Sequence, residues 1–149
     1  MAEEVTSLKS LAEFLGEPNI KVVVPKIQRA YAQGRKSEKN IRNQFVDELF
    51  TALENGTTLE LSFVYGSKIK TEDGSSIRFE LLDGQQRITT LVLLSWFLAC
   101  ASGKEIPQFI KSFNYETRTT SETFLKELAD NPLDVINEKP SDALRNRQW

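Results

Sequence analysis

Residues 83–87, Asp-Gly-Gln-Gln-Arg, have the types and spacing of an anion-binding turn. They follow an apolar segment typical of a β-strand and precede residues 88–101, an apolar segment typical of a buried helix. Where a strand breaks at a glycine such as Gly84 and the chain continues as a helix, the first N–H groups of the helix converge and can bind an anion. Arg87 breaks a local rule, because the positive end of a helix dipole disfavours a cation, and such exceptions concentrate at functional sites. The pattern predicts a phosphate-binding turn.

The other side chains of this turn leave a second interpretation open. Gln85 and Gln86 place uncharged donors and acceptors where the backbone amides would converge, and Thr89 adds a hydroxyl in the first helical turn. These residues favour ligand binding. Alternatively, Asp83 is a plain helix N-cap and Arg87 pairs with it one turn later, which would make the turn purely structural.

A second candidate group lies in the loop after the first predicted strand. Gln28, Arg29 and Tyr31 follow the strand-ending Pro25. An arginine can bind phosphate through two N–H donors at once, and an aromatic ring can stack on a base. The alternative is a solvated loop without a ligand.

Basic residues gather at the start of the second predicted helix. They are Arg35, Lys36, Lys39 and Arg42. Together with Arg29 they could contact a DNA backbone, in which case affinity would fall steeply with salt as counterions are released. A solvated helix face is the other explanation.

The composition removes several kinds of chemistry. The 149-residue sequence has one cysteine, no histidine and a formal net charge of −2. Without histidine it contains no Ser-His-Asp triad, no His-Cys zinc site and no His-based nuclease. The length fits one domain with a hydrophobic core of its own. The acidic start favours a cytoplasmic protein, and no apolar run reaches the ~20 residues needed to cross a membrane.

Hydrophobic periodicity predicts a mixture of helices and strands. Helices are expected over residues 7–15, 37–55, 88–101 and 120–128. Strands are expected over residues 21–24, 59–65 and 77–82. Residues 106–115 fit either a strand or a loop.

Two further features refine this pattern. The last two strands form a hairpin around an Asp-Gly turn, and the second helix carries an apolar stripe of Ile41, Phe45, Leu49 and Leu53. The mixture favours an α+β fold over a regular βαβ repeat. We expect one domain over residues 1–130, followed in residues 131–149 by the truncated start of a helical region.

With these residues identified, two motifs resemble the N-terminal domain of GmrSD-type restriction endonucleases. They are Val24-Pro-Lys-Ile-Gln-Arg-Ala-Tyr31 and Leu82-Asp-Gly-Gln-Gln-Arg-Ile-Thr-Thr-Leu91. Residues 63–66 and 114–125 resemble further segments of that family, so the similarity covers about residues 8–128. Gln33 and Ser95 depart from the family pattern, which commonly has tryptophan and often histidine at these places.

The resemblance implies a ParB/sulfiredoxin-like fold, a small mixed sheet with a buried helix after the turn. In that superfamily a turn at a helix N-terminus holds nucleotide phosphates. By position, the implied binding residues are Gly84, Gln85, Gln86, Arg87 and Thr89, with Gln28, Arg29 and Tyr31 facing them. The implied ligand is a nucleoside triphosphate, with Mg²⁺.

The family also implies nucleotide-stimulated or nucleotide-hydrolysing action in bacterial defence against phage. Asp83 and Arg87 are then the candidate catalytic residues: Arg87 would offset phosphate charge and Asp83 would position metal or water. A His-Asn-His nuclease domain often follows in this family, and the missing histidines place any such partner region outside this sequence. We expect a nucleotide-binding regulatory domain of a restriction system. The alternative is a DNA-binding module without nucleotide chemistry.

Overall fold

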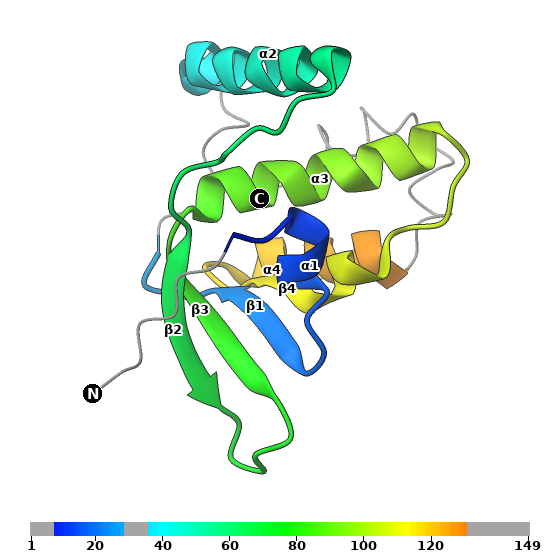
Figure 1. The fold of residues 1–149 in the computed structure, drawn as a ribbon. Coiled ribbons are helices and arrows are strands. Elements are labelled where there is room, and N and C mark those ends of the chain that lie inside the picture. The colour runs from blue at the N-terminus through cyan, green and yellow to red at the C-terminus, as the bar shows by residue number, and fades with distance from the viewer. Residues whose placement is uncertain (1–7, 29–35, 131–149) are drawn as a thin grey trace.

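A mixed β-sheet forms the centre of the domain (Figure 1). The computed structural model describes residues 8–28 and 36–130. Within them, four strands form one sheet in the order β2-β3-β1-β4. Their bounds are Ile20–Val24 for β1, Tyr65–Lys70 for β2, Ile77–Asp83 for β3 and Phe113–Tyr115 for β4. The central strand β1 is parallel to both β3 and β4, whereas β2 is antiparallel to β3.

The described residues also form four α-helices and two short 3₁₀ segments. The α-helices are α1 at Leu11–Leu15, α2 at Lys39–Asn55, α3 at Gln85–Ala101 and α4 at Thr119–Asp130. The 3₁₀ segments are η1 at Lys36–Glu38 and η2 at Gln108–Ser112. Residues 106–115, which fitted either a strand or a loop, thus contain η2 and β4. The mixed sheet with helices confirms the predicted α+β class.

The core is organised around α3, as predicted for an almost wholly apolar helix. Trp96 is fully buried, and its indole N–H donates to the carbonyl oxygen of Leu128 in α4 at 3.0 Å. Alternate residues of β1, Val22 and Val24, face this core together with Leu81 of β3. Burial of these aliphatic and aromatic side chains is the main term that stabilises the fold.

The start of the first helix corrects the prediction. Helix α1 begins at Leu11 rather than at residue 7, because a capping box fixes it there. The Ser10 hydroxyl accepts from the backbone N–H of Glu13 at 3.3 Å, and the Glu13 carboxylate accepts from the backbone N–H of Ser10 at 2.7 Å. Two N–H groups that lack helical partners are satisfied by this exchange.

The prediction of a strand over residues 59–65 is wrong. The strand β2 lies further along the chain, and Phe63, which the alternating pattern placed on it, is 78% exposed. The hairpin turn sets the pairing instead: the Thr71 N–H donates to the Ser76 carbonyl at 3.0 Å, which brings Lys70 opposite Ile77. Register in a hairpin follows the turn geometry, so polar residues next to the turn form the strand.

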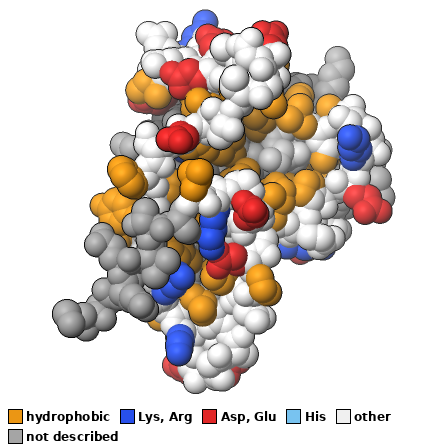
Figure 2. All heavy atoms as spheres, viewed as in Figure 1, with side chains coloured by type: hydrophobic (Ala, Val, Ile, Leu, Met, Phe, Trp, Pro, Cys, Tyr) orange, Lys and Arg blue, Asp and Glu red, His pale blue; other side chains and the backbone are white. Residues whose placement is uncertain are grey.

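Helix α2 has the predicted extent, but its apolar stripe is not part of the core. None of its residues is buried, and Ile41 and Leu53 are 57% and 74% exposed. In Figure 1 the helix lies beyond α3, on the side away from the sheet, and Figure 2 shows hydrophobic side chains on the surface below it. The amphipathic pattern therefore identified the helix correctly, and the structure shows that its stripe lies outside the core cluster.

Among the described residues, no helix has the length and apolar character required to cross a membrane. Residues 131–149, where the start of a helical region is expected, lie outside the described part of the chain.

Candidate functional site

Three parallel strands end at one edge of the sheet. Because β3 and β4 both run parallel to β1, their carboxyl ends and the loops that follow them lie on the same side. The loop after β1 carries Gln28, and the turn after β3 starts α3 at Gly84. Ligands of open sheets commonly bind outside the carboxyl ends of parallel strands. Gln28 of the first motif therefore lies beside the turn of the second motif.

Gly84 is the residue that makes the turn into α3 possible. Its φ is +85°, in the left-handed region, and it occupies the N-cap position of the helix. A Cβ at this position would lie 2.8 Å from Cγ2 of Val64, so a side chain would be both strained and obstructed. The interpretation of Asp83 as the N-cap is therefore wrong by one residue. The cap position has no side chain that could accept a hydrogen bond from the first N–H groups of α3.

The two glutamines of the turn are buried. Gln85 and Gln86 are 6% and 7% exposed, and Nε2 of Gln85 donates to Oε1 of Gln28 at 3.2 Å. Thr89 is fully buried, and its hydroxyl donates to the Gln85 carbonyl at 2.6 Å. Thr89, a predicted binding residue, therefore has its donor engaged within the helix and no exposed surface. The structure brings Gln28 into contact with the turn, as the motif predicted.

Arg87 has a structural contact in addition to its predicted role. Its Nη2 donates to the carbonyl oxygen of Phe63 at 2.9 Å and lies 3.9 Å from Oδ2 of Asp83. The Asp83–Arg87 pair that a purely structural turn would contain is thus present, although its distance is at the outer limit for an ion pair. Arginine has five N–H donors, and the Phe63 carbonyl uses only one side of the guanidinium. The side chain of Arg87 is 28% exposed, so a ligand can reach it.

Several predicted residues are not part of this described site. Arg29, Tyr31 and Arg35 lie outside the described residues. Lys39 is exposed and Arg42 half-exposed in the first turn of α2, which begins on the same side of the molecule as α3 (Figure 1).

Within the described part of the chain, no three cysteine, aspartate or glutamate side chains gather as a metal site. Asp83, the predicted metal-positioning residue, is a single carboxylate whose side chain is 59% exposed.

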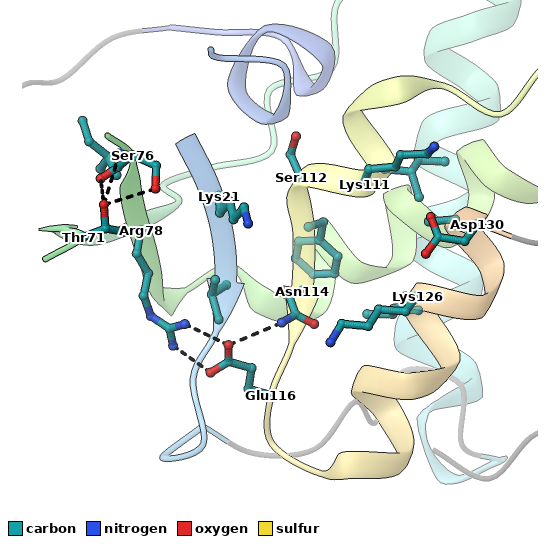
Figure 3. Close-up of a pocket in the computed structure, with 16 residues that line it drawn as sticks. Lys21, Thr71, Ser76, Arg78, Lys111, Ser112, Asn114, Glu116, Lys126 and Asp130 are labelled. Carbon is teal, nitrogen blue, oxygen red and sulfur yellow. Dashed lines mark hydrogen bonds and ion pairs between the residues drawn. The ribbon is translucent and has the colours of Figure 1, made fainter. Parts of the chain in front are cut away.

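The sequence did not predict an ion-pair network on the face of the sheet opposite the one from which Val22 and Val24 point into the core (Figure 3). Arg78 of β3 reaches past β1 and donates from Nη1 and Nη2 to the Glu116 carboxylate at 2.8 and 2.7 Å. Its Nε donates to Glu80 at 2.7 Å, and Asn114 also donates to Glu116 at 3.3 Å. The hydrogen bonds from Arg78 lower the pKa of Glu116, and those bonds raise the pKa of Arg78. The sequence signal for this polar face was a pair of charged residues at alternate positions of an otherwise apolar strand, Arg78 and Glu80.

Residues 11–148, nearly the whole chain, match the protein family described as "GmrSD restriction endonuclease, N-terminal domain". The chain belongs to the GmrSD family. The resemblance seen in the two motifs is thereby confirmed, and the GmrSD domain described here is the N-terminal domain of a component of a DNA restriction system. No curated protein matches the sequence.

Proposed function

We propose that this GmrSD domain binds a nucleoside triphosphate at the turn of residues 83–87 and regulates its restriction system in response, as a defence against phage. The observation that carries the proposal is the left-handed Gly84 at the start of α3, next to the buried pair of Gln85 and Gln28. This arrangement directs the first N–H groups of a 17-residue helix toward the edge where three parallel strands end. A phosphate placed there would meet N–H donors and the positive end of the helix dipole.

The side chains around the turn take complementary roles. Arg87 would direct its remaining N–H donors at the phosphate oxygens, as charge-assisted hydrogen bonds. Asp83 would hold Mg²⁺ together with the triphosphate, because Mg²⁺ is commonly bound by one or two carboxylates plus substrate phosphates. A single exposed carboxylate fits that requirement without a dedicated protein cage. If hydrolysis takes place, Asp83 and Arg87 are the residues placed to support it.

The same arrangement supports a ParB/sulfiredoxin-like assignment of the fold. The supporting features are a small mixed sheet, a turn at the carboxyl end of a strand, and a buried helix that begins at that turn.

A thermal-shift experiment tests the proposal. The melting temperature would be measured with each of ATP, GTP, CTP and UTP in the presence of Mg²⁺, for the natural sequence, for Arg87→Ala and for Lys104→Ala. Lys104 is an exposed cation beyond the far end of α3, so its loss is a matched change of charge. We expect at least one triphosphate to raise the melting temperature of the natural protein and of Lys104→Ala, and to have no effect on Arg87→Ala.

The shift caused by ligand must be separated from the stability of the ligand-free protein. Arg87→Ala also removes the bond to the Phe63 carbonyl, which lowers the free energy of unfolding by about 1 kcal/mol or less, because this bond is at the exposed surface and water can replace the lost donor. The readout is therefore the difference between the melting temperatures measured with and without nucleotide for each variant. The proposal fails if no triphosphate changes the melting temperature, or if Arg87→Ala keeps the full shift.

A further inference from the structure

Residues 63–65 form one wall of the turn at residues 83–87. The chain coming from α2 passes the beginning of α3 there before it enters β2 (Figure 1). Each of the three residues has its own contact with the turn: Phe63 through its carbonyl with Arg87, Val64 through its side chain with Gly84, and Tyr65 as the β-pairing partner of Asp83. The backbone of this segment is therefore fixed relative to the candidate site.

A β-bulge places Tyr65 opposite Asp83. Along the hairpin the register advances by one residue on each strand, as far as Gly66 opposite Leu81. A regular ladder would continue with Tyr65 opposite Leu82, but the register shifts at this step and Tyr65 pairs with Asp83 instead. Bulges re-aim side chains and are over-represented next to active sites. The irregularity brings an aromatic residue to the first position of the turn.

The ring of Tyr65 stands at the surface beside the Asp83 carboxylate. Tyr65 is 58% exposed, and the side chain of Asp83 is 59% exposed. Directly opposed residues of an antiparallel pair have their side chains on one face, with Cβ atoms about 4.5–5.5 Å apart. Within the described part of the chain, Tyr65 makes no ring–ring contact. Its ring is therefore accessible next to the carboxylate that is assigned above to Mg²⁺ and the triphosphate.

We propose that the base of the bound nucleotide stacks on Tyr65. This inference rests on the proposed function, because it places the base of a nucleoside triphosphate whose phosphates bind at the turn. Every nucleobase has a π face that can stack on an aromatic ring, and stacking does not require hydrogen bonds to the edge of the base. Tyr65 therefore adds affinity for nucleotides in general and does not select one base.

Isothermal titration calorimetry with two classes of probe tests this role. ATP, GTP, CTP and UTP have a base, whereas inorganic tripolyphosphate has none, and each is titrated in the presence of Mg²⁺. The proteins are the natural sequence, Tyr65→Ala, Tyr65→Phe, which keeps an aromatic ring, and Phe50→Ala. Phe50 is 61% exposed on α2, so its loss is a matched removal of a surface ring away from the turn.

We expect Tyr65→Ala to bind every nucleotide that the natural protein recognises about 5- to 100-fold more weakly, the range found when a stacking ring is replaced by alanine. Tripolyphosphate should bind to Tyr65→Ala as it does to the natural protein, because the phosphate contacts at the turn are unchanged. Tyr65→Phe and Phe50→Ala should bind nucleotides normally. A merely structural role for Tyr65 would instead weaken nucleotides and tripolyphosphate alike.

The outcomes separate this inference from the proposed function. The inference is overturned, and the proposed function stands, if nucleotides bind equally well to Tyr65→Ala and to the natural protein. It is also overturned if Tyr65→Ala loses affinity for nucleotides and tripolyphosphate to the same extent, since the residue then supports the turn and not the base. If no nucleotide binds to the natural protein, the proposed function itself fails and this inference fails with it.

Discussion

The side chain of Gln85 donates to Oε1 of Gln28 at 3.2 Å and so joins two residues that are 57 positions apart in the sequence. Gln85 stands in the first turn of α3 and Gln28 in the loop after β1. The bond connects the two motifs of the candidate site inside the protein, at a position where Gln85 is 6% exposed. An amide pair of this kind can stabilise the site in the absence of ligand, because a buried amide without a partner is unfavourable.

The first prediction concerns this pair. Gln85→Ala and Gln28→Ala should each lower the free energy of unfolding by about 1–2 kcal/mol, since each change leaves a partner amide unpaired. In urea unfolding, the double variant should cost less than the sum of the two single changes, with a coupling of about 0.5–1.5 kcal/mol. Gln44→Ala is the matched control, because Gln44 donates at 3.0 Å to Glu48 on the exposed surface of α2. Fully additive effects at Gln28 and Gln85 would contradict the assignment.

The second prediction separates strain from obstruction at Gly84. Gly84→Ala meets both a φ of +85° and the Val64 side chain, whereas Gly74→Ala meets a φ of +68° with nothing within 4 Å. The alanine at 74 should cost about 1–2 kcal/mol from backbone strain alone, and the alanine at 84 should cost more. Thermal or urea unfolding measures both. The cost of Gly84→Ala should be smaller when it is introduced into the Val64→Ala protein than when it is introduced into the natural protein. An equal cost in the two backgrounds would show that Val64 does not restrict this turn.

The third prediction concerns pH. The hydrogen bonds from Arg78 hold the pKa of Glu116 below its ordinary value of 4.5. A carboxyl with a lowered native pKa binds protons less readily in the folded state than in the unfolded state. Its stabilising contribution is complete above about pH 4.5 and is lost as the pH falls through the native pKa.

Urea unfolding at a series of pH values checks this contribution. Between neutral pH and pH 3, the natural protein should lose more free energy of unfolding than Glu116→Gln, which has no titrating group at that position. Glu60→Gln, at an exposed acid before β2, is the control and should follow the natural protein. Asp73 has a pKa of about 2 because the Thr71 hydroxyl donates to it. It is present in all three proteins, so its contribution to the pH dependence cancels in the comparison. Parallel curves for Glu116→Gln and the natural protein would rule out the linkage.

Local sequence signals predicted the individual elements well where one short segment decides the outcome. Residues 88–101 are apolar on all sides and form the greater part of the buried helix α3, and the chain turns from strand to helix at Gly84 as predicted. The Asp-Gly of the hairpin loop likewise lies between two antiparallel strands. These features depend on backbone sterics and on hydrogen bonds between near neighbours, which a short stretch of sequence contains.

Predictions that depended on distant partners were less successful. The alternating residues 59–65 read as a strand, but the hairpin register formed β2 from Tyr65–Lys70 instead. The stripe on α2 predicted a helix, and only the structure shows that this face lies outside the core, with Leu53 74% exposed. Periodicity shows which side chains share a face and does not show what that face contacts.

The sequence by itself determined the family, the α+β class and the position of the candidate turn, and its lack of histidine excluded a His-dependent nuclease from these 149 residues. Only the tertiary structure decided that Gln28 contacts the turn, that Arg87 also binds the Phe63 carbonyl, and that Lys21 stands beside Arg78 on the second face of the sheet. The physical reason is distance along the chain. Local conformational preferences act within a few residues, whereas these contacts form when strands and loops far apart in sequence pack together, and their stability depends on the whole core.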